Sequence, residues 1–420
     1  MELLFCLLLV CIVCLFAAFL LLLAGIIYYE CTNSEIPAGV DQPFKLRVLQ
    51  MQFIGIAVVG RILENLGIWN QLGFTRYIRD QLFVNRLKGD SKLSIKDSQF
   101  NQIPVRIYHP KAPAACRRRG VIFFHGGGWM FGSLNSYDTL CRYIAKQSDS
   151  VVVSVQYRLA PEFRYPAQFE DCLNTAVYVI QNAEHLGIDA SSIVICGDSA
   201  GGNLTAAVCQ KLAQRNDLLP VCAQVLIYPA LQAVDFNLPS YQQNRDIPIL
   251  FQTRSLFYHL HYLNGEIEFL EDMLEGNHVP AEMKLKFKKW IDPDKIPEEF
   301  KVRGYNPKII TSHTDDAYEV LQQALEPTFS PLLAENDIIR KLPQTYILTC
   351  EYDVLRDDGI LYKKRLEDNG VQVTWYHSTD GFHGIISFFD CRCLTFPSGK
   401  KALDNIVHFI KTTKSSSKEL

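Results

Sequence analysis

Short, continuously apolar segments alternate with helical patterns along most of this chain, and no other feature restricts the fold as strongly. Six segments read as buried strands: GVIFF (120–124), SVVVSVQY (150–157), SSIVICG (191–197), AQVLIYP (223–229), QTYILTC (344–350) and QVTWYH (372–377). Helical patterns lie between most of them, at 137–148, 168–182, 202–215, 357–369 and 400–411. Strands that are apolar on both faces and are joined by helices are typical of a mostly parallel sheet covered on both sides. We therefore predict an α/β fold.

Two regions interrupt this alternation and divide the chain. Residues 99–234 and 331–412 contain the predicted strands and form the expected sheet domain. Residues 235–330 are a long insertion rich in aromatic residues, prolines and charges. Because structureless loops of that length are rare, we expect a helical cap over the carboxyl edge of the sheet. The amphipathic segment 31–98 reads as helical and contributes to this cap, and residues 413–420 read as a flexible tail.

The N-terminus carries an apolar run without any charge from residue 3 to residue 29. A bilayer is spanned by about 20 apolar residues, whereas the apolar core of a cleavable signal peptide has only about 7–15. We therefore predict a transmembrane signal anchor over residues 1–30, with a signal peptide as the alternative. Glu2 precedes the run, and Lys45 and Arg47 are the first basic residues after it. These charges leave the orientation of the anchor open.

Composition excludes some partners and cofactors. Lys and Arg total 42 against 45 for Asp and Glu, a net charge of −3, so the basic excess typical of nucleic-acid binders is missing. The 13 cysteines are scattered without metal-ligand spacing, and most read as buried free thiols. One or two disulfides remain an alternative if the chain folds in the secretory lumen. We expect no metal and no cofactor.

The segment ICGDSAGGN (195–203) contains the pattern G-x-S-x-G, with Gly197, Ser199 and Gly201 in the defining positions. A predicted strand precedes it and a predicted helix follows it. That context places a serine on a tight strand-to-helix turn with its hydroxyl exposed. Ser199 is therefore the candidate nucleophile. The flanking glycines let the two elements approach, and Asp198 is expected to point away from the reactive side.

Three glycines in a row, Gly126, Gly127 and Gly128, follow His125 at the end of a predicted strand. A loop of this H-G-G-G type supplies backbone N–H donors to a negatively charged oxygen in α/β-hydrolases, together with the residue after the nucleophile, here Ala200. A phosphate-binding loop is the rival interpretation, but no G-K-[ST] follows and no G-x-G-x-x-G is present. His125 is expected to hold the loop, with a role as catalytic base as the alternative.

A serine nucleophile needs a base, and in α/β-hydrolases the partners follow in the order Ser, Asp or Glu, His. His383 lies in TDGFHGI (379–385), between glycines and after the last predicted strand. It is the predicted base. His377 lies within the strand pattern itself and is the weaker candidate.

The predicted acid lies in TCEYDVLRDDG (349–359). Asp353 comes after the end of a strand and before a helix, as an acid at the carboxyl edge of the sheet must. Asp357 and Asp358 read as residues of the first helical turn, where the helix dipole favours carboxylates. Asp380, three residues before the predicted base, is kept as an alternative.

Six ordered motifs resemble the arylacetamide deacetylase family of hormone-sensitive-lipase-type α/β-hydrolases, over roughly residues 40–410. They are HGGGW (125–129), YRLAPE (157–162), GDSAGGN (197–203), YPAL (228–231), DVLRDDG (353–359) and DGFHG (380–384). The resemblance implies a triad of Ser199, Asp353 and His383, with the glycines after His125 and the N–H of Ala200 as the oxyanion hole. It also implies a single-pass endoplasmic reticulum membrane protein with a lumenal catalytic domain.

These observations together predict a membrane-anchored serine hydrolase of neutral, apolar carboxylic esters or amides. The acetyl ester, arylacetamide and lipid ester types all remain open. The hypothesis from another class is a binding protein, since hydrolase folds also serve as receptors after losing a triad member. The presence of all three triad residues weighs against it.

Overall fold

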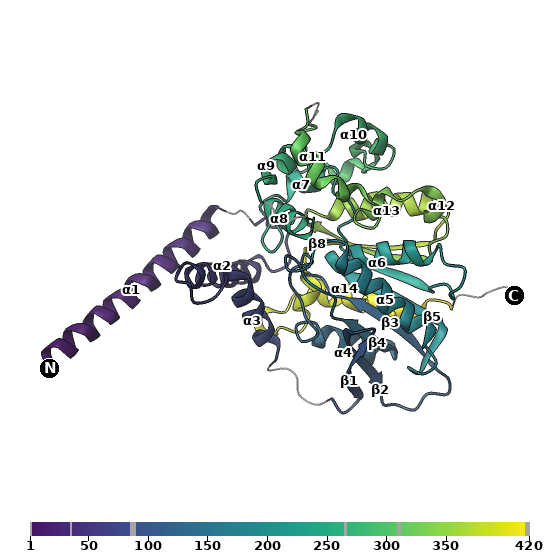
Figure 1. Cartoon of the computed structure of the whole chain (residues 1–420), viewed down its shortest axis with the longest axis horizontal. Helices are drawn as coiled ribbons and strands as arrows, with labels where there is room; N and C mark the ends of the chain where they lie inside the picture. Colours follow the sequence, from purple (N-terminus) through teal and green to yellow (C-terminus); the bar gives the residue numbers. More distant parts are fainter. Residues whose placement is uncertain (1, 34–35, 85–89, 264–266, 309–311, 416–420) are drawn as a thin grey trace.

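One eight-stranded sheet forms the centre of the part of the chain that the computed structural model describes, residues 2–33, 36–84, 90–263, 267–308 and 312–415 (Figure 1). Its spatial order is β1-β2-β4-β3-β5-β6-β7-β8. β1 pairs antiparallel with β2 and β2 with β4, and all other neighbours are parallel. The strands are β1 (Leu93–Phe100), β2 (Ile103–Pro110), β3 (Arg118–Phe124), β4 (Val151–Val155), β5 (Ile188–Asp198), β6 (Ala223–Ile227), β7 (Gln344–Tyr352) and β8 (Val373–Phe382). The predicted α/β fold with a mostly parallel sheet is confirmed.

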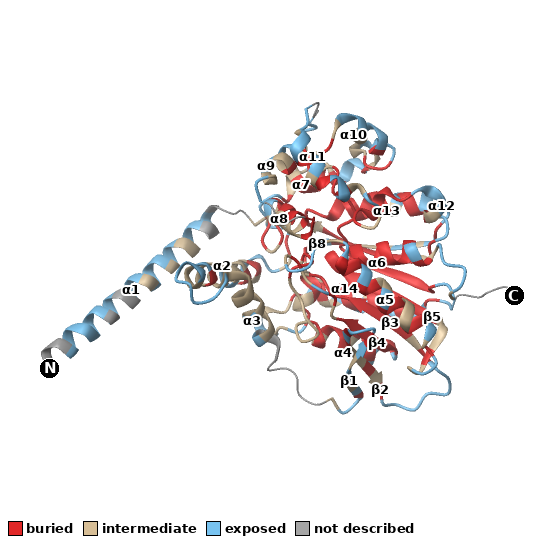
Figure 2. Ribbon diagram, in the orientation of Figure 1, coloured by how far each residue is buried: buried red, intermediate tan, exposed pale blue. Residues whose placement is uncertain are grey.

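Both faces of the sheet are buried, which explains why its strands are continuously apolar. Val121 and Phe123 of β3 belong to one core, and Ile122 and Phe124 belong to the other, as the alternation of side chains along a strand requires. Figure 2 shows the buried sheet between helical layers. The helices that line the two cores are α4 (Asp138–Ser148) and α14 (Pro397–Thr412) on one side, and α5 (Ala167–Gln181), α6 (Ala200–Leu212) and α13 (Arg356–Asp368) on the other.

The parallel strands bring their carboxyl ends to one edge of the sheet, where ligands bind in open α/β folds. Residues 235–330 contribute short helices and loops, and Trp129, at the end of the glycine run, packs against them. Its ring stacks on that of Tyr262 at 4.4 Å between centroids. The elements of this segment are α7 (Pro239–Gln243), α8 (Gln252–Leu263), α9 (Leu270–Glu275), α10 (Ala281–Lys288), η1 (Pro293–Lys295), η2 (Glu298–Phe300), α11 (Asp315–Leu321) and η3 (Gln322–Leu325).

Between this segment and the last two strands, and again after β8, short helices connect the sheet. They are η4 (Pro331–Leu333), α12 (Asn336–Ile339), η5 (Ile385–Phe388) and η6 (Arg392–Leu394).

In the described residues before the sheet there are three helices: α1 (Glu2–Asn33), α2 (Pro43–Asn65) and α3 (Gln71–Val84). α1 extends away from the body of the molecule (Figure 1), and its apolar side chains are exposed, with Leu21 at 74%. Among the described residues, α2 has the length and apolar composition of a membrane-crossing helix, and residues 17–29 form a shorter apolar stretch. Leu46 and Leu49 of α2 are nevertheless buried in the core shared with α4 and α14.

The structure corrects two predictions at the borders of the sheet domain. Residues 93–98 belong to strand β1 and not to a helical segment, because the backbone of this edge strand pairs antiparallel with that of β2. Residues 413–415 of the predicted flexible tail are held in place. Thr413 is 8% exposed and its carbonyl accepts a hydrogen bond from Arg119 at 2.6 Å. The remaining tail residues, 416–420, lie outside the described residues.

Candidate active site

Ser199 occupies a strained turn between β5 and α6. Its φ of 56° and ψ of −119° are unusual for a residue with a side chain, and such a conformation costs on the order of 1–3 kcal/mol. A hydrogen bond from the Ser199 N–H to the carbonyl of Ile227 at 2.8 Å ties the turn to the neighbouring strand β6. The turn also needs a very close approach, because a Cβ on Gly201 would collide with the carbonyl oxygen of Phe124. The sequence therefore folds locally as the G-x-S-x-G pattern predicts.

The ends of three strands bring Ser199, His383 and Asp353 together. The Ser199 hydroxyl oxygen lies 2.9 Å from Nε2 of His383, and Nδ1 of His383 lies 2.8 Å from Oδ2 of Asp353. The carboxylate of Asp353 is fully buried, and its other oxygen accepts from the N–H of Leu355 at 2.9 Å. A carboxylate only accepts hydrogen bonds, so the ring proton lies on Nδ1 and Nε2 is left to accept from the serine. This arrangement prepares the hydroxyl for deprotonation.

The two alternative residues have other partners. Oδ2 of Asp380 accepts from the hydroxyl of Ser398 at 2.5 Å, and Oδ1 accepts from Ser378 at 3.2 Å. Nε2 of His377 lies 3.3 Å from Oε2 of Glu351. Neither Asp380 nor His377 is therefore hydrogen bonded to the serine or to His383 in the described part of the chain.

Asp357 and Asp358 lie in the first turn of α13, as predicted, but both are fully buried and bind other segments. Asp357 accepts from the N–H of Ser240 at 2.6 Å, and Asp358 accepts from the N–H of Leu231 at 2.9 Å. Burial raises the pKa of Asp358 to about 8. The two carboxyl groups hold the chain that runs from β6 into α7, a role that the sequence pattern did not reveal.

The glycine run lies beside the serine, but its three N–H groups differ. Gly126 donates to Oδ1 of Asp198 at 2.9 Å, which corrects the expectation that it belongs to the oxyanion hole. Gly127 and Gly128 have φ values of 114° and 61°, a conformation that glycine adopts without strain. Within the described residues, no protein group accepts a hydrogen bond from the N–H of Gly127, Gly128 or Ala200. These three donors are available to a developing negative charge.

Asp198 and His125 both contact the loop at Gly126. Oδ2 of Asp198 accepts from the hydroxyl of Tyr137 at 3.0 Å, and burial raises the pKa of this carboxyl to about 6. His125 is fully buried, its Nδ1 lies 2.9 Å from the carbonyl oxygen of Gly126, and its ring stacks on that of Tyr157. Burial lowers the pKa of His125 to about 4. These contacts fit a structural role for both residues.

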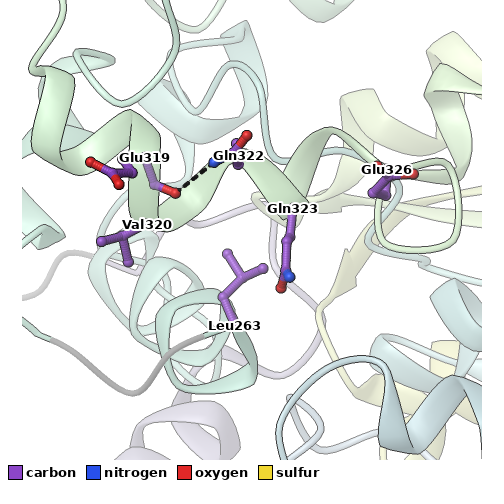
Figure 3. A pocket seen from close by; sticks show the side chains of 6 residues that line it. All are labelled: Leu263, Glu319, Val320, Gln322, Gln323 and Glu326. Atoms are coloured by element: carbon purple, nitrogen blue, oxygen red, sulfur yellow. Dashed lines mark hydrogen bonds between the residues drawn. The ribbon is translucent and has the colours of Figure 1, made fainter.

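A separate cavity of about 430 Å³ is lined mainly by residues of α8, α11 and η3, and none of the predicted site residues lines it (Figure 3). Its lining residues are Leu263, Glu319, Val320, Gln322, Gln323 and Glu326.

Over the described residues, no group of three or more His, Cys, Asp or Glu side chains is placed to hold a metal ion.

Comparisons with known proteins agree on one family. Residues 121–274 and 303–387 match the family of the alpha/beta hydrolase fold. Arylacetamide deacetylase-like 4 of Homo sapiens is 42% identical over 379 residues, covering 90% of this chain and 92% of that protein. Neutral cholesterol ester hydrolase 1 of Mus musculus is 37% identical over 385 residues, with 89% and 93% covered. A solved esterase of Pyrobaculum calidifontis superposes with a TM-score of 0.60 and 27% identity, covering 81% of this chain and 92% of its own.

The raised pKa of Asp198 predicts a pH-dependent stability. An unfolded chain gives this carboxyl an ordinary pKa near 4, so the folded state holds its proton more tightly. The resulting stabilisation is complete below about pH 4 and is lost as the pH rises through about 6. Relative to Asp198→Asn, the wild type should lose on the order of 2–3 kcal/mol of the free energy of unfolding between pH 4 and pH 7.

Urea unfolding of both proteins at several pH values measures this difference. Asp217→Asn is the control, because Arg215 lowers the pKa of the Asp217 carboxyl to about 2. The folded state keeps this group ionised across the window, and the unfolded state ionises it just above pH 4, so the difference between this variant and the wild type should be nearly constant, and any small change should favour the wild type as the pH rises. A constant difference for Asp198→Asn as well would contradict the prediction.

Proposed function

This chain belongs to the arylacetamide deacetylase family of the alpha/beta hydrolase fold and is a carboxylic ester hydrolase, and we propose that it acts through a triad of Ser199, His383 and Asp353. One observation carries the proposal, the hydrogen-bonded chain from the serine hydroxyl through the imidazole to a buried carboxylate. The strained backbone of Ser199 supports it, since such strain concentrates at functional residues.

In the proposed acylation step, the Ser199 hydroxyl oxygen attacks the substrate carbonyl while Nε2 of His383 takes the hydroxyl proton. The carboxylate of Asp353 stabilises the imidazolium that forms. The carbonyl oxygen becomes negative in the tetrahedral intermediate and accepts hydrogen bonds from the free N–H groups of Gly127, Gly128 and Ala200. One such donor typically contributes about 100–1000-fold to the rate.

The intermediate then collapses as His383 returns the proton to the leaving alcohol or amine, which departs and leaves an acyl group on Ser199. In the deacylation step, a water molecule takes the place of the serine hydroxyl. His383 takes a proton from this water while the water oxygen attacks the acyl carbonyl; His383 then returns the proton to the Ser199 oxygen as the bond between that oxygen and the acyl carbon breaks, and the carboxylic acid leaves. His383 thus carries each transferred proton in the proposed cycle.

We propose that the substrate is a neutral ester or amide of the acetyl ester, arylacetamide or lipid ester type. The names of the two relatives, an arylacetamide deacetylase-like protein and a cholesterol ester hydrolase, support this range. The ring of Tyr258 lies so close to Gly128 that a Cβ there would collide with it. An apolar aromatic wall beside the oxyanion donors favours an apolar acyl or alcohol group.

We also propose that α1 anchors the enzyme in the endoplasmic reticulum membrane, as a single-pass protein with its catalytic domain in the lumen. The uncharged run and its exposed apolar side chains support an anchor. The orientation rests on the family resemblance. α2 is proposed to stay outside the bilayer core, because its buried leucines pack against the body and Lys45 donates to the carbonyl of Thr395 at 2.9 Å.

A fluorophosphonate probe should label Ser199 covalently, because the probe reacts with an activated serine and mimics the tetrahedral intermediate. Labelling followed by peptide mass spectrometry identifies the residue. Ser199→Ala should abolish labelling while leaving the thermal unfolding transition in place. Label that persists in this variant would overturn the assignment of the nucleophile.

Asp353→Asn should lower kcat on a p-nitrophenyl acyl ester by about 10³–10⁴-fold, because the imidazole loses the partner that holds its tautomer. Asp380→Asn is the matched control, since Asp380 also lies near the end of β8 but binds Ser378 and Ser398. It should retain kcat within a few-fold. Steady-state kinetics of both variants measure the two kcat values. A larger loss of kcat in Asp380→Asn than in Asp353→Asn would mean that Asp380 is the acid of the triad.

Removal of residues 1–30 should leave an enzyme that is still labelled by the probe but is no longer integral to membranes. All proposed catalytic residues lie beyond residue 120, and α1 projects away from them. Carbonate extraction of membranes from cells that express the full-length or truncated protein measures the attachment. Truncated protein that resists carbonate would show that a second segment, α2 above all, is integral.

A further inference from the structure

One face of α3 lies on the loop that follows the glycine run. Arg76, Arg79 and Asp80 are spaced three and four residues apart, so their side chains share a face of the helix. Each contacts a successive part of the loop, whereas Tyr77, on another face, is 47% exposed. The contacts are Arg76 Nε to the Met130 carbonyl oxygen at 2.8 Å, the Arg79 guanidinium at 5.0 Å from the Phe131 ring centroid, and the Ser133 hydroxyl to Asp80 Oδ1 at 2.6 Å.

Arg76 is the most connected of the three. Besides Met130, its guanidinium donates to the carbonyl of Ala160 at 2.7 Å and makes two bonds to the carboxylate of Glu162, at 2.6 and 2.9 Å. Met130 and Ala160 are 3% and 0% exposed, and buried carbonyl groups need a donor. The planar fork of an arginine can serve all three acceptors at once, which a lysine cannot.

A relay of two peptide groups connects Arg76 to a proposed oxyanion donor. The carbonyl of Met130 and the N–H of Phe131 belong to one planar peptide group. That N–H donates to the carbonyl of Gly127 at 2.9 Å. The Gly127 carbonyl in turn shares its peptide plane with the N–H of Gly128, which has no acceptor among the described residues. Hydrogen bonds in such a chain polarise one another.

We propose that Arg76 is a positioning residue for hydrolysis, which orients and polarises the Gly128 N–H through this relay. The inference rests on the proposed function of the glycine loop. Arg76 touches neither substrate nor triad, and it acts when negative charge develops on the substrate oxygen. Loss of Arg76 should therefore reduce the enzyme's stabilisation of the transition state more than its binding of the substrate.

Arg76→Ala should lower kcat by about 10–100-fold with KM within about twofold, the size of effect that a small misplacement of catalytic groups produces. The affinity for an aryl trifluoromethyl ketone, which adds to the serine and places an oxyanion in the hole, should fall by a similar factor. Arg76→Lys, which restores a charged donor, should recover part of both. A merely structural role would lower the melting temperature but leave the ketone affinity of the folded protein unchanged.

Arg61→Ala is the control, since Arg61 lies on the neighbouring helix α2 with 67% of its side chain exposed and pairs only with Glu64 at 3.5 Å among the described contacts. It should keep wild-type kcat and ketone affinity. If Arg76→Ala does not fold, Arg76→Lys decides the question. Folded Arg76 variants with unchanged kcat and ketone affinity would overturn the inference. A wild type that the fluorophosphonate does not label would instead overturn the proposed function.

Discussion

The backbone of Ser199 is the constraint on which the rest of the site depends. Its strained conformation, with a positive φ, turns the chain sharply from β5 into α6, and the turn closes only because Gly201 lets α6 approach the carbonyl of Phe124 at the end of β3. That approach also sets the position of the glycine run, which begins one residue after His125. One local conformation thus brings together a hydroxyl group and the backbone donors that the proposed reaction needs.

Four buried carboxyl groups at the carboxyl edge of the sheet hold the surrounding loops. Asp198 binds the glycine loop, Asp353 binds the imidazole, and Asp357 and Asp358 bind the chain that runs from β6 into α7. Each accepts a hydrogen bond from a backbone N–H, which offsets part of the cost of burial. Burial nevertheless raises the pKa of Asp198 and Asp358. The four carboxyl groups are therefore alike in burial but hold different parts of the chain in place.

The helices before the sheet divide into two kinds. α1 exposes its apolar side chains and projects from the body, as a membrane anchor would. α2 and α3 pack on the sheet domain, and α3 reaches the glycine loop through Arg76 and Asp80. α2 and α3 are therefore an integral part of the folded enzyme, and the charged residues of α3 complete hydrogen bonds that the sheet domain leaves open.

The sequence by itself determined the α/β class, the positions of most strands and of the helices that cover the sheet, the turn at Ser199 and the order of Ser199, Asp353 and His383. These follow from local spacing, from apolar runs and from glycines, which act on near neighbours in the chain. Only the tertiary structure decided the partners. Asp380 accepts a hydrogen bond from Ser398 and not from His383, which is close to it in the sequence. The N–H of Gly126 donates to Asp198. The tertiary structure also paired the polar strand β1 with β2 and placed Arg76 on Met130, 54 residues away. A hydrogen bond depends on where distant elements meet, and that geometry is not contained in any local pattern.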